Sequence, residues 1–145
     1  MARFNKVYAG PVTEVRPQVD EVIATASILP GCLITQAGAL AVAATATEVL
    51  IAQEDYLTGK DADTAYDVGD LVVGMKMLPS QFFNARVAAT VAVTKGAALA
   101  LGASGLLVLA TAGARVVAFA EETVTVGATA DLVRVRPATG YRLEA

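Results

Sequence analysis

The chain repeats its own pattern, and this repetition constrains its fold more than any other feature. Residues 22–31 read VIATASILPG and residues 87–96 read VAATVAVTKG, with Val, Ala, Thr and the closing Gly in matching places. EVLIAQED at 48–55 has a later counterpart in RVVAFAEE at 115–122, where an apolar run again ends in acids. Both pairs of blocks follow the same order along the chain.

A third block completes the pattern. DLVVGMKMLP, which begins at Asp70, corresponds to DLVRVRP, which begins at Asp131, and each block closes on a proline. Three blocks in the same order indicate a tandem duplication over about residues 21–79 and 86–137. Because this unit is longer than the 20–50 residues typical of solenoids and propellers, we expect two halves of one β domain.

The repeated blocks have the composition of β-strands. Val, Ile and Thr dominate VIATASI, VAATVAV, ETVTV and LVRVRP, and glycines separate the blocks at short intervals. VLIA and VVAF are unbroken apolar runs, for which we predict burial on both faces. The sequence thus predicts an all-β, jelly-roll-like sandwich or barrel as a single domain over 21–145, preceded by an extended arm over 1–20. We expect 138–145 to form a short polar end. A helix within the alanine-rich stretches is an alternative that periodicity alone leaves open.

One stretch resembles a membrane span. Residues 97–114 carry no charge and lie between Lys95 and Arg115. Glycines interrupt this stretch, and alanine is a poor driver of membrane insertion. Its counterpart in the first copy contains Thr35 and Gln36, so we predict a hairpin of two strands and expect no membrane segment.

Composition narrows the classes of function. The chain has 145 residues, no histidine, one cysteine and a net charge of −3. Without histidine it lacks the side chain best suited to proton transfer near neutral pH, and its acidic balance argues against bulk nucleic-acid binding. The apolar share of 55% is rich in alanine, and aromatic residues make up only 6%. We expect no enzyme activity and no cofactor, and a thin core favours burial against copies of itself or a partner.

Several motifs have both a chemical and a structural interpretation. The acidic stretch 54–70 offers carboxylates for calcium, but its spacing does not match the helix–loop–helix calcium motif, so we favour a solvated insertion. Cys32 has no histidine to activate it and is interpreted as a small core thiol. Glu121 and Glu122 are adjacent, so on a strand they point to opposite faces and make a poor acid–base pair. No metal or catalytic site is predicted.

Cationic and aromatic residues at the two ends of the chain are the candidate contacts. Arg134 and Arg136 alternate with valines and therefore share one face of a strand. Such a face is either ordinary solvated surface or a contact for an acidic partner. The arm adds further cations and two aromatic anchors, and it either binds a partner or pairs with its own domain. The candidate partner-binding residues are Arg3, Phe4, Lys6, Tyr8, Arg16, Arg134 and Arg136.

The tandem pattern resembles a known family. TKGAALAL, the glycine turn into GLLVLATAG, the acid-closed VVAFAEE and the final DLVRVRP are similar to blocks in small capsid decoration, or cement, proteins of tailed bacteriophages. The jelly-roll cement type of short-tailed Bordetella phage is the nearest in style. The resemblance covers roughly residues 21–137, and the acidic insertion at 57–67 departs from it because the second copy has no counterpart.

The resemblance implies a structural virion protein. Such a protein binds the outer surface of the capsid, bridges subunits of the phage major capsid protein, and assembles in the cytoplasm of the bacterial host. It implies a homo-oligomer, with a dimer favoured and a trimer possible, and neither a membrane nor a nucleic-acid partner. The alternatives are another phage structural subunit of the tail or adaptor, or a small soluble ligand-binding β-barrel.

Overall fold

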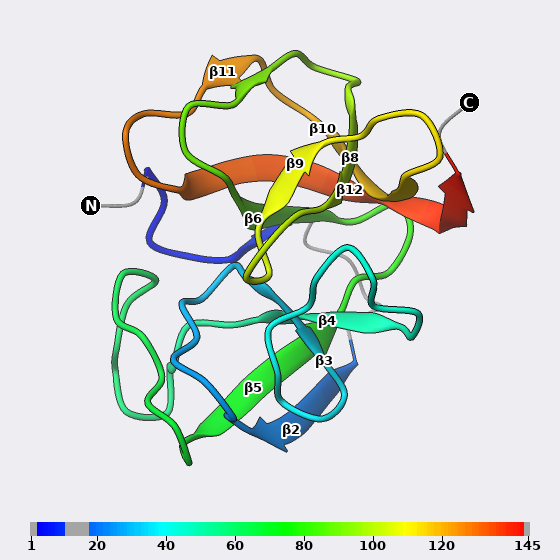
Figure 1. Ribbon diagram of the computed structural model, residues 1–145. Helices are drawn as coiled ribbons and strands as arrows, with labels where there is room; N and C mark the ends of the chain where they lie inside the picture. Colours follow the sequence, from blue (N-terminus) through cyan, green and yellow to red (C-terminus); the bar gives the residue numbers. More distant parts are fainter. Residues whose placement is uncertain (1–2, 11–17, 144–145) are drawn as a thin grey trace.

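Strands supply the regular secondary structure of the computed structural model, which describes residues 3–10 and 18–143 (Figure 1). No helix occurs in this part of the chain. The strands form two sheet systems stacked on one another, one for each half of the sequence (Figure 1). The all-β fold class predicted from the sequence is therefore confirmed, and the sheets form a barrel-like arrangement.

The first half forms a four-stranded antiparallel sheet in the order β2-β5-β4-β3. Its strands are β2 (Val19–Ile23), β3 (Leu33–Thr35), β4 (Val49–Ala52) and β5 (Leu71–Lys76). The turn that follows β3 comes back to the end of β2, where the Thr25 amide donates to the carbonyl oxygen of Gly38 at 3.0 Å. This contact curls the sheet toward closure.

The second half, together with β1 of the N-terminal arm, forms the larger sheet, in the order β1-β6-β12-β10-β8-β9, and β9 also pairs with β6. This last pairing is parallel and joins Leu107 to Val87, which closes the strands into a barrel. A small ribbon of β7 and β11 lies above it (Figure 1). The strands are β1 (Tyr8–Gly10), β6 (Phe82–Val87), β7 (Ala92–Val93), β8 (Ala98–Leu101), β9 (Leu107–Leu109), β10 (Arg115–Ala120), β11 (Val124–Thr125) and β12 (Asp131–Leu143).

Corresponding strands occupy corresponding places in the two sheets. The order β2-β5-β4-β3 matches β6-β12-β10-β8, strand for strand, and each is a Greek-key order. The smaller pairings match as well: the Ile34–Leu40 bridge of the first half corresponds to the pairing of Leu101 with Leu107 in the second. The sequence repeats thus coincide with two sheets of the same connectivity.

Strand β4 shows how the two halves share their cores. Its residues alternate between two apolar clusters: Val49 and Ile51 join the large core with the second sheet, while Leu50 and Ala52 join a smaller core within the first half. All four are buried, as predicted for VLIA. In the second half Val116, Val117 and Ala118 are buried too. Phe119 is partly exposed, so for VVAF the prediction of burial on both faces is wrong at its last residue.

The uncharged stretch 97–114 is a hairpin, as predicted. Strands β8 and β9 pair antiparallel within it, with Leu99 opposite Leu109. In the described part of the chain, no helix has the length and apolar character needed to cross a membrane.

Matching glycines make close contacts between strands. Gly38 and Gly105 have φ angles of +78° and +72°, a region that favours glycine. A Cβ at Gly38 would collide with the carbonyl oxygen of Ile23, and a Cβ at Gly105 would collide with that of Leu33. The repeated glycine therefore allows each turn to approach the backbone of another strand.

The edges of the domain differ from expectation. Strand β2 begins at Val19, inside the predicted arm, and β1 forms a strand within that arm. The expected polar end is wrong for 138–143, because β12 runs to Leu143 and pairs there with Arg115 of β10. A barrel strand can continue past its core when a neighbour still offers backbone partners.

Candidate binding surface

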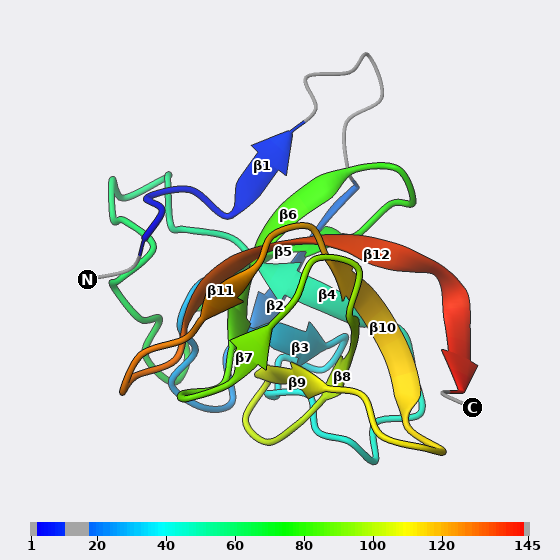
Figure 2. The ribbon, with the colours of Figure 1, turned by 90° about the horizontal axis from the view of Figure 1, so that it is seen from above.

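The N-terminal arm lies on its own domain over residues 3–10. Strand β1 pairs antiparallel with β6 and runs along its outer edge (Figure 2). The Asn84 amide donates to the Val7 carbonyl oxygen at 2.6 Å, and the Asn84 side chain donates to the carbonyl oxygen of Lys6 at 2.8 Å. The Val7 side chain is fully buried in the large core. Residues 3–10 of the arm therefore pair with their own domain, which is one of the two alternatives that the sequence left open.

Carboxylates at the ends of corresponding strands hold the arm. Glu54 follows β4, is 6% exposed, and accepts a hydrogen bond from the Val7 amide at 3.1 Å. The Lys6 ammonium lies 3.4 Å from the same carboxylate. Glu122 follows β10 and forms an ion pair with Arg3 at 3.2 Å.

The acids that close the first apolar run are buried. An acid at the end of an apolar run is most often solvated, yet Glu54 and Asp55 are both buried, together with the preceding Gln53. Burying a carboxylate is costly unless hydrogen bonds and opposite charge compensate it. The arm supplies that compensation for Glu54, so part of the repeated acid motif is an anchor for the arm.

Three of the predicted contact residues meet at one place on the surface. The Arg3 guanidinium lies 5.3 Å from the centre of the Phe4 ring, and the Arg134 guanidinium lies 5.7 Å from it. The Phe4 ring packs against buried Leu132 and Ala62. We call Arg3, Phe4 and Arg134 the cation–aromatic cluster.

Of the two arginines in this cluster, Arg134 is the one whose charge no described carboxylate neutralises. Its side chain is exposed, and in the described part of the chain no carboxylate forms an ion pair with it. The Glu122 carboxylate instead accepts from the Arg134 backbone amide at 2.7 Å and pairs with Arg3. A guanidinium stacked on an aromatic ring keeps its planar fork of donors available for a carboxylate.

The other predicted contact residues are engaged differently. Arg136 shares the face of Arg134 but pairs with Glu121 at 2.6 Å and lies over Phe119 at 4.7 Å. Tyr8 packs on Phe83 with ring centres 5.7 Å apart. Lys6 is largely exposed despite its contact with Glu54. Arg16 lies outside the described residues.

The acidic stretch 54–70 is partly built into the fold. Asp55 accepts hydrogen bonds from the Thr58 hydroxyl at 2.5 Å and from its amide, and these bonds lower the pKa of Asp55. Tyr66 is buried, and its hydroxyl donates to the carbonyl oxygen of Gln53 at 3.0 Å. Most of residues 56–70 are exposed, as expected for a solvated insertion, whereas Glu54, Asp55, Ala62 and Tyr66 are buried. In the described residues no group of three or more acids, cysteines or histidines is placed to hold a metal.

Arg86 is a buried cation that sequence reasoning missed. Its side chain is 4% exposed and donates to the carbonyl oxygens of Pro30 at 2.8 Å, Ala62 at 2.6 Å and Ala130 at 3.3 Å. These acceptors belong to both halves of the chain and to the acidic stretch. The available signal was an arginine within an otherwise strand-like FFNARV, which is unusual unless its charge is satisfied internally.

Cys32 is buried, as predicted for a core thiol. Desolvation raises the pKa of the Cys32 thiol to about 11, and the nearby charge of Arg86 offsets only part of that effect. A thiol with this pKa is protonated at neutral pH and is a poor nucleophile.

Comparison with known proteins gives no assignment. No protein-family model matches the sequence, and no curated protein matches it.

Proposed function

We propose that this chain is a structural virion protein of a tailed bacteriophage. It binds the outer surface of the capsid and stabilises the shell by bridging subunits of the major capsid protein. The sequence blocks that resemble cement proteins support this proposal, and the barrel-like fold is compatible with it. In the proposed role the protein presents surfaces to the shell and performs no chemistry, and it works as a homo-oligomer, a dimer before a trimer.

The cation–aromatic cluster is the observation that carries the proposal. It joins an exposed guanidinium without an ion-pair partner in the described chain to a ring that is fixed by buried neighbours. Arginine and aromatic residues are enriched among residues that dominate binding energy at protein interfaces. An acidic surface on the capsid lattice is the partner that this cluster fits, and steering by charge then favours association.

The docked arm gives the cluster its shape. Arg3 and Phe4 come from the arm, whereas Arg134 comes from β12, so the cluster exists only while the arm lies on β6. A preformed surface of this kind loses little conformational entropy on binding. We therefore propose that the arm acts by completing the contact surface of its own domain, and not by adding to the sheet of a neighbour.

A charge-reversal comparison tests the role of the cluster. We compare Arg134→Glu with Lys95→Glu, a matched control that changes the net charge equally at another exposed site. Each variant is mixed with expanded phage capsids and sedimented. We expect Arg134→Glu to weaken co-sedimentation at least ~10-fold, as charge reversal at a contact costs more than ~1.4 kcal/mol. Lys95→Glu should remain within about two-fold of the parent. Equal weakening by both variants, or by neither, would reject the cluster as the contact.

A further inference from the structure

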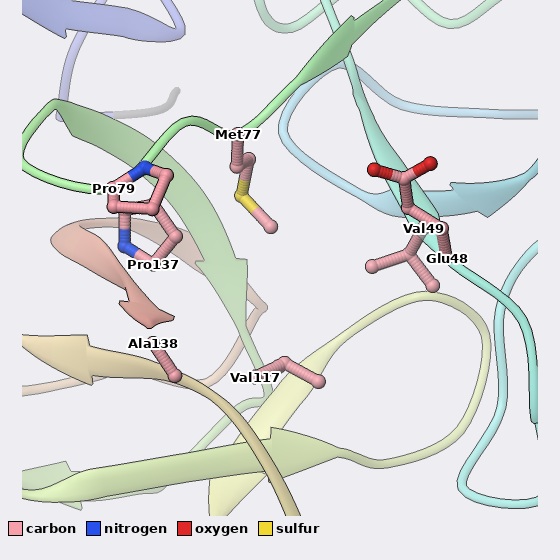
Figure 3. A pocket seen from close by; sticks show the side chains of 7 residues that line it. All are labelled: Glu48, Val49, Met77, Pro79, Val117, Pro137 and Ala138. Carbon is pink, nitrogen blue, oxygen red and sulfur yellow. The ribbon is translucent and has the colours of Figure 1, made fainter. Parts of the chain in front are cut away.

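A pocket opens at the seam between the two halves of the chain. Its volume is about 170 Å³, and in Figure 3 the side chains from the two halves surround one space. The lining residues are Glu48, Val49, Met77 and Pro79 from the first half and Val117, Pro137 and Ala138 from the second. The pocket therefore depends on the stacking of the two sheets.

Two valines and two prolines give this seam pocket walls that the fold holds in place. Val49 is 2% exposed and Val117 is fully buried, and they belong to the corresponding strands β4 and β10. Pro79 and Pro137 are the prolines that close the two repeated blocks, and proline has a fixed φ angle. A pocket with such walls is preformed, so an occupant does not have to order it.

The chemistry of the pocket is apolar with one acidic side. Met77, both prolines and the two valines present hydrocarbon or sulfur, and the Glu48 carboxylate lies beside Val49 at one side of the space (Figure 3). Glu48 is exposed, and it forms no ion pair within the described ranges 3–10 and 18–143. An apolar cavity of about 150 Å³ is large enough for benzene, so this pocket can hold one large apolar side chain.

We propose that the seam pocket binds an extended segment of a partner protein, which inserts one leucine-sized or phenylalanine-sized side chain and places an adjacent lysine or arginine against Glu48. Apolar contact provides the affinity, and the carboxylate selects the flanking residue. This site is separate from the cation–aromatic cluster and has the opposite charge preference. The proposal holds whether or not the partner belongs to a capsid.

A second copy of this chain is a poor occupant. Among the residues whose side-chain exposure the structure describes, the large apolar ones that are most exposed have no lysine or arginine within two positions in the sequence. Several have acids there instead, as at Ile23, Val68 and Leu71. A copy that inserted one of these residues would bring a carboxylate toward Glu48 or offer it no charge. The expected occupant is therefore a different, basic segment.

Short peptides test the proposal without the natural partner. The probe is the capped peptide Gly-Lys-Leu-Lys-Gly, compared with Gly-Lys-Ala-Lys-Gly and Gly-Glu-Leu-Glu-Gly, each titrated into the full chain with methyl-labelled side chains. One buried leucine supports only roughly millimolar affinity, so NMR shift changes of the Val49, Val117 and Met77 methyl groups are the readout. We expect shifts with the lysine–leucine peptide, and none with the alanine peptide at equal concentration.

Charge exchange at Glu48 supplies the decisive comparison. Glu48 is exposed, so Glu48→Gln and Glu48→Lys should leave the fold intact, which the remaining methyl shifts verify. Glu48→Gln should weaken binding of the lysine–leucine peptide about two- to five-fold, the range for an exposed ion pair. Glu48→Lys should bind the glutamate–leucine peptide better than the lysine–leucine one.

Three outcomes would overturn the proposal. The first is the absence of pocket shifts with the lysine–leucine peptide at millimolar concentration. The second is a peptide preference that Glu48→Lys does not reverse. The third is a shift of the same methyl groups when the protein alone is concentrated, since that would identify a second copy as the occupant.

Discussion

Removal of the Arg86 side chain is expected to destabilise the whole domain. The guanidinium is buried and donates to carbonyl oxygens of Pro30 and Ala62 in the first half and Ala130 in the second. Its amide also donates to the Gly31 carbonyl oxygen at 2.9 Å, so the strand itself is fixed at this point. The side chain therefore joins the two sheets and the acidic stretch through hydrogen bonds from a charged donor.

The size of the destabilisation follows from the carbonyl oxygens that lose their hydrogen-bond donor. In Arg86→Ala each of the carbonyl oxygens loses its donor, at about 1–3 kcal/mol for a buried group. Water that enters the vacated space recovers part of this loss. We expect a net loss of about 3–5 kcal/mol in the free energy of unfolding, which corresponds to roughly 10–20 °C in Tm for a chain of this size.

Chemical denaturation, monitored by circular dichroism in the far ultraviolet, measures this change in the free energy of unfolding. The matched control is Lys95→Ala, which removes an exposed cation and should change the unfolding free energy by no more than about 0.5 kcal/mol. Arg86→Lys should give an intermediate value, because one ammonium group cannot reach acceptors spread around a guanidinium. A loss below about 1 kcal/mol for Arg86→Ala would refute the assignment of Arg86 as the link between the halves.

Further substitutions and a pH series test other parts of the structure. Gly38→Ala should lower the free energy of unfolding by more than about 2 kcal/mol, because its Cβ would meet the Ile23 backbone. Gly59→Ala has a similar φ of +74° but open space around it, and should lower the free energy of unfolding by only about 1 kcal/mol. Thermal unfolding of the two variants measures the difference. Val7→Ala should lower the free energy of unfolding by about 1–3 kcal/mol if the arm is docked on its own domain, and no change in denaturant midpoint would contradict that docking. Burial raises the pKa of Cys32 from 9.0 to about 11 and that of Tyr66 from 10.0 to about 12, so the unfolded chain loses these protons first. Denaturation midpoints should therefore be constant from about pH 6 to 8 and fall from about pH 8 to 12. A flat profile over the alkaline range would contradict the burial of both groups.

The strand pattern was predictable because it depends on local composition. Apolar runs such as VLIA, and the glycines between them, indicate strands and turns without knowledge of distant contacts. The duplication added long-range information: because Thr35 and Gln36 stand in the first copy, the uncharged stretch at 97–114 could be assigned to a hairpin. The structure bears out that assignment in β8 and β9.

The buried charges were not predictable in the same way. Glu54 ends an apolar run and looks like a residue entering solvent, but its hydrogen-bond donor is the Val7 amide, 47 positions earlier. Arg86 likewise finds acceptors that are 56 and 24 positions away. Whether a charge is buried depends on such partners, and a single sequence does not pair them. Arg3, Phe4 and Arg134 were among the seven residues predicted as contacts, but their grouping depends on the path of the arm.

The most direct test of the proposed function is to count bound copies on capsids by electron cryomicroscopy. Purified protein is mixed with expanded and with unexpanded shells of the phage proposed to encode it, and the outer surfaces are reconstructed. We expect the protein at a fixed ratio to the major capsid protein on the outside of expanded shells, with Arg134 facing the lattice. Absence of binding to both forms, or assembly of the protein into rings or tubes separate from the shell, would contradict the proposal.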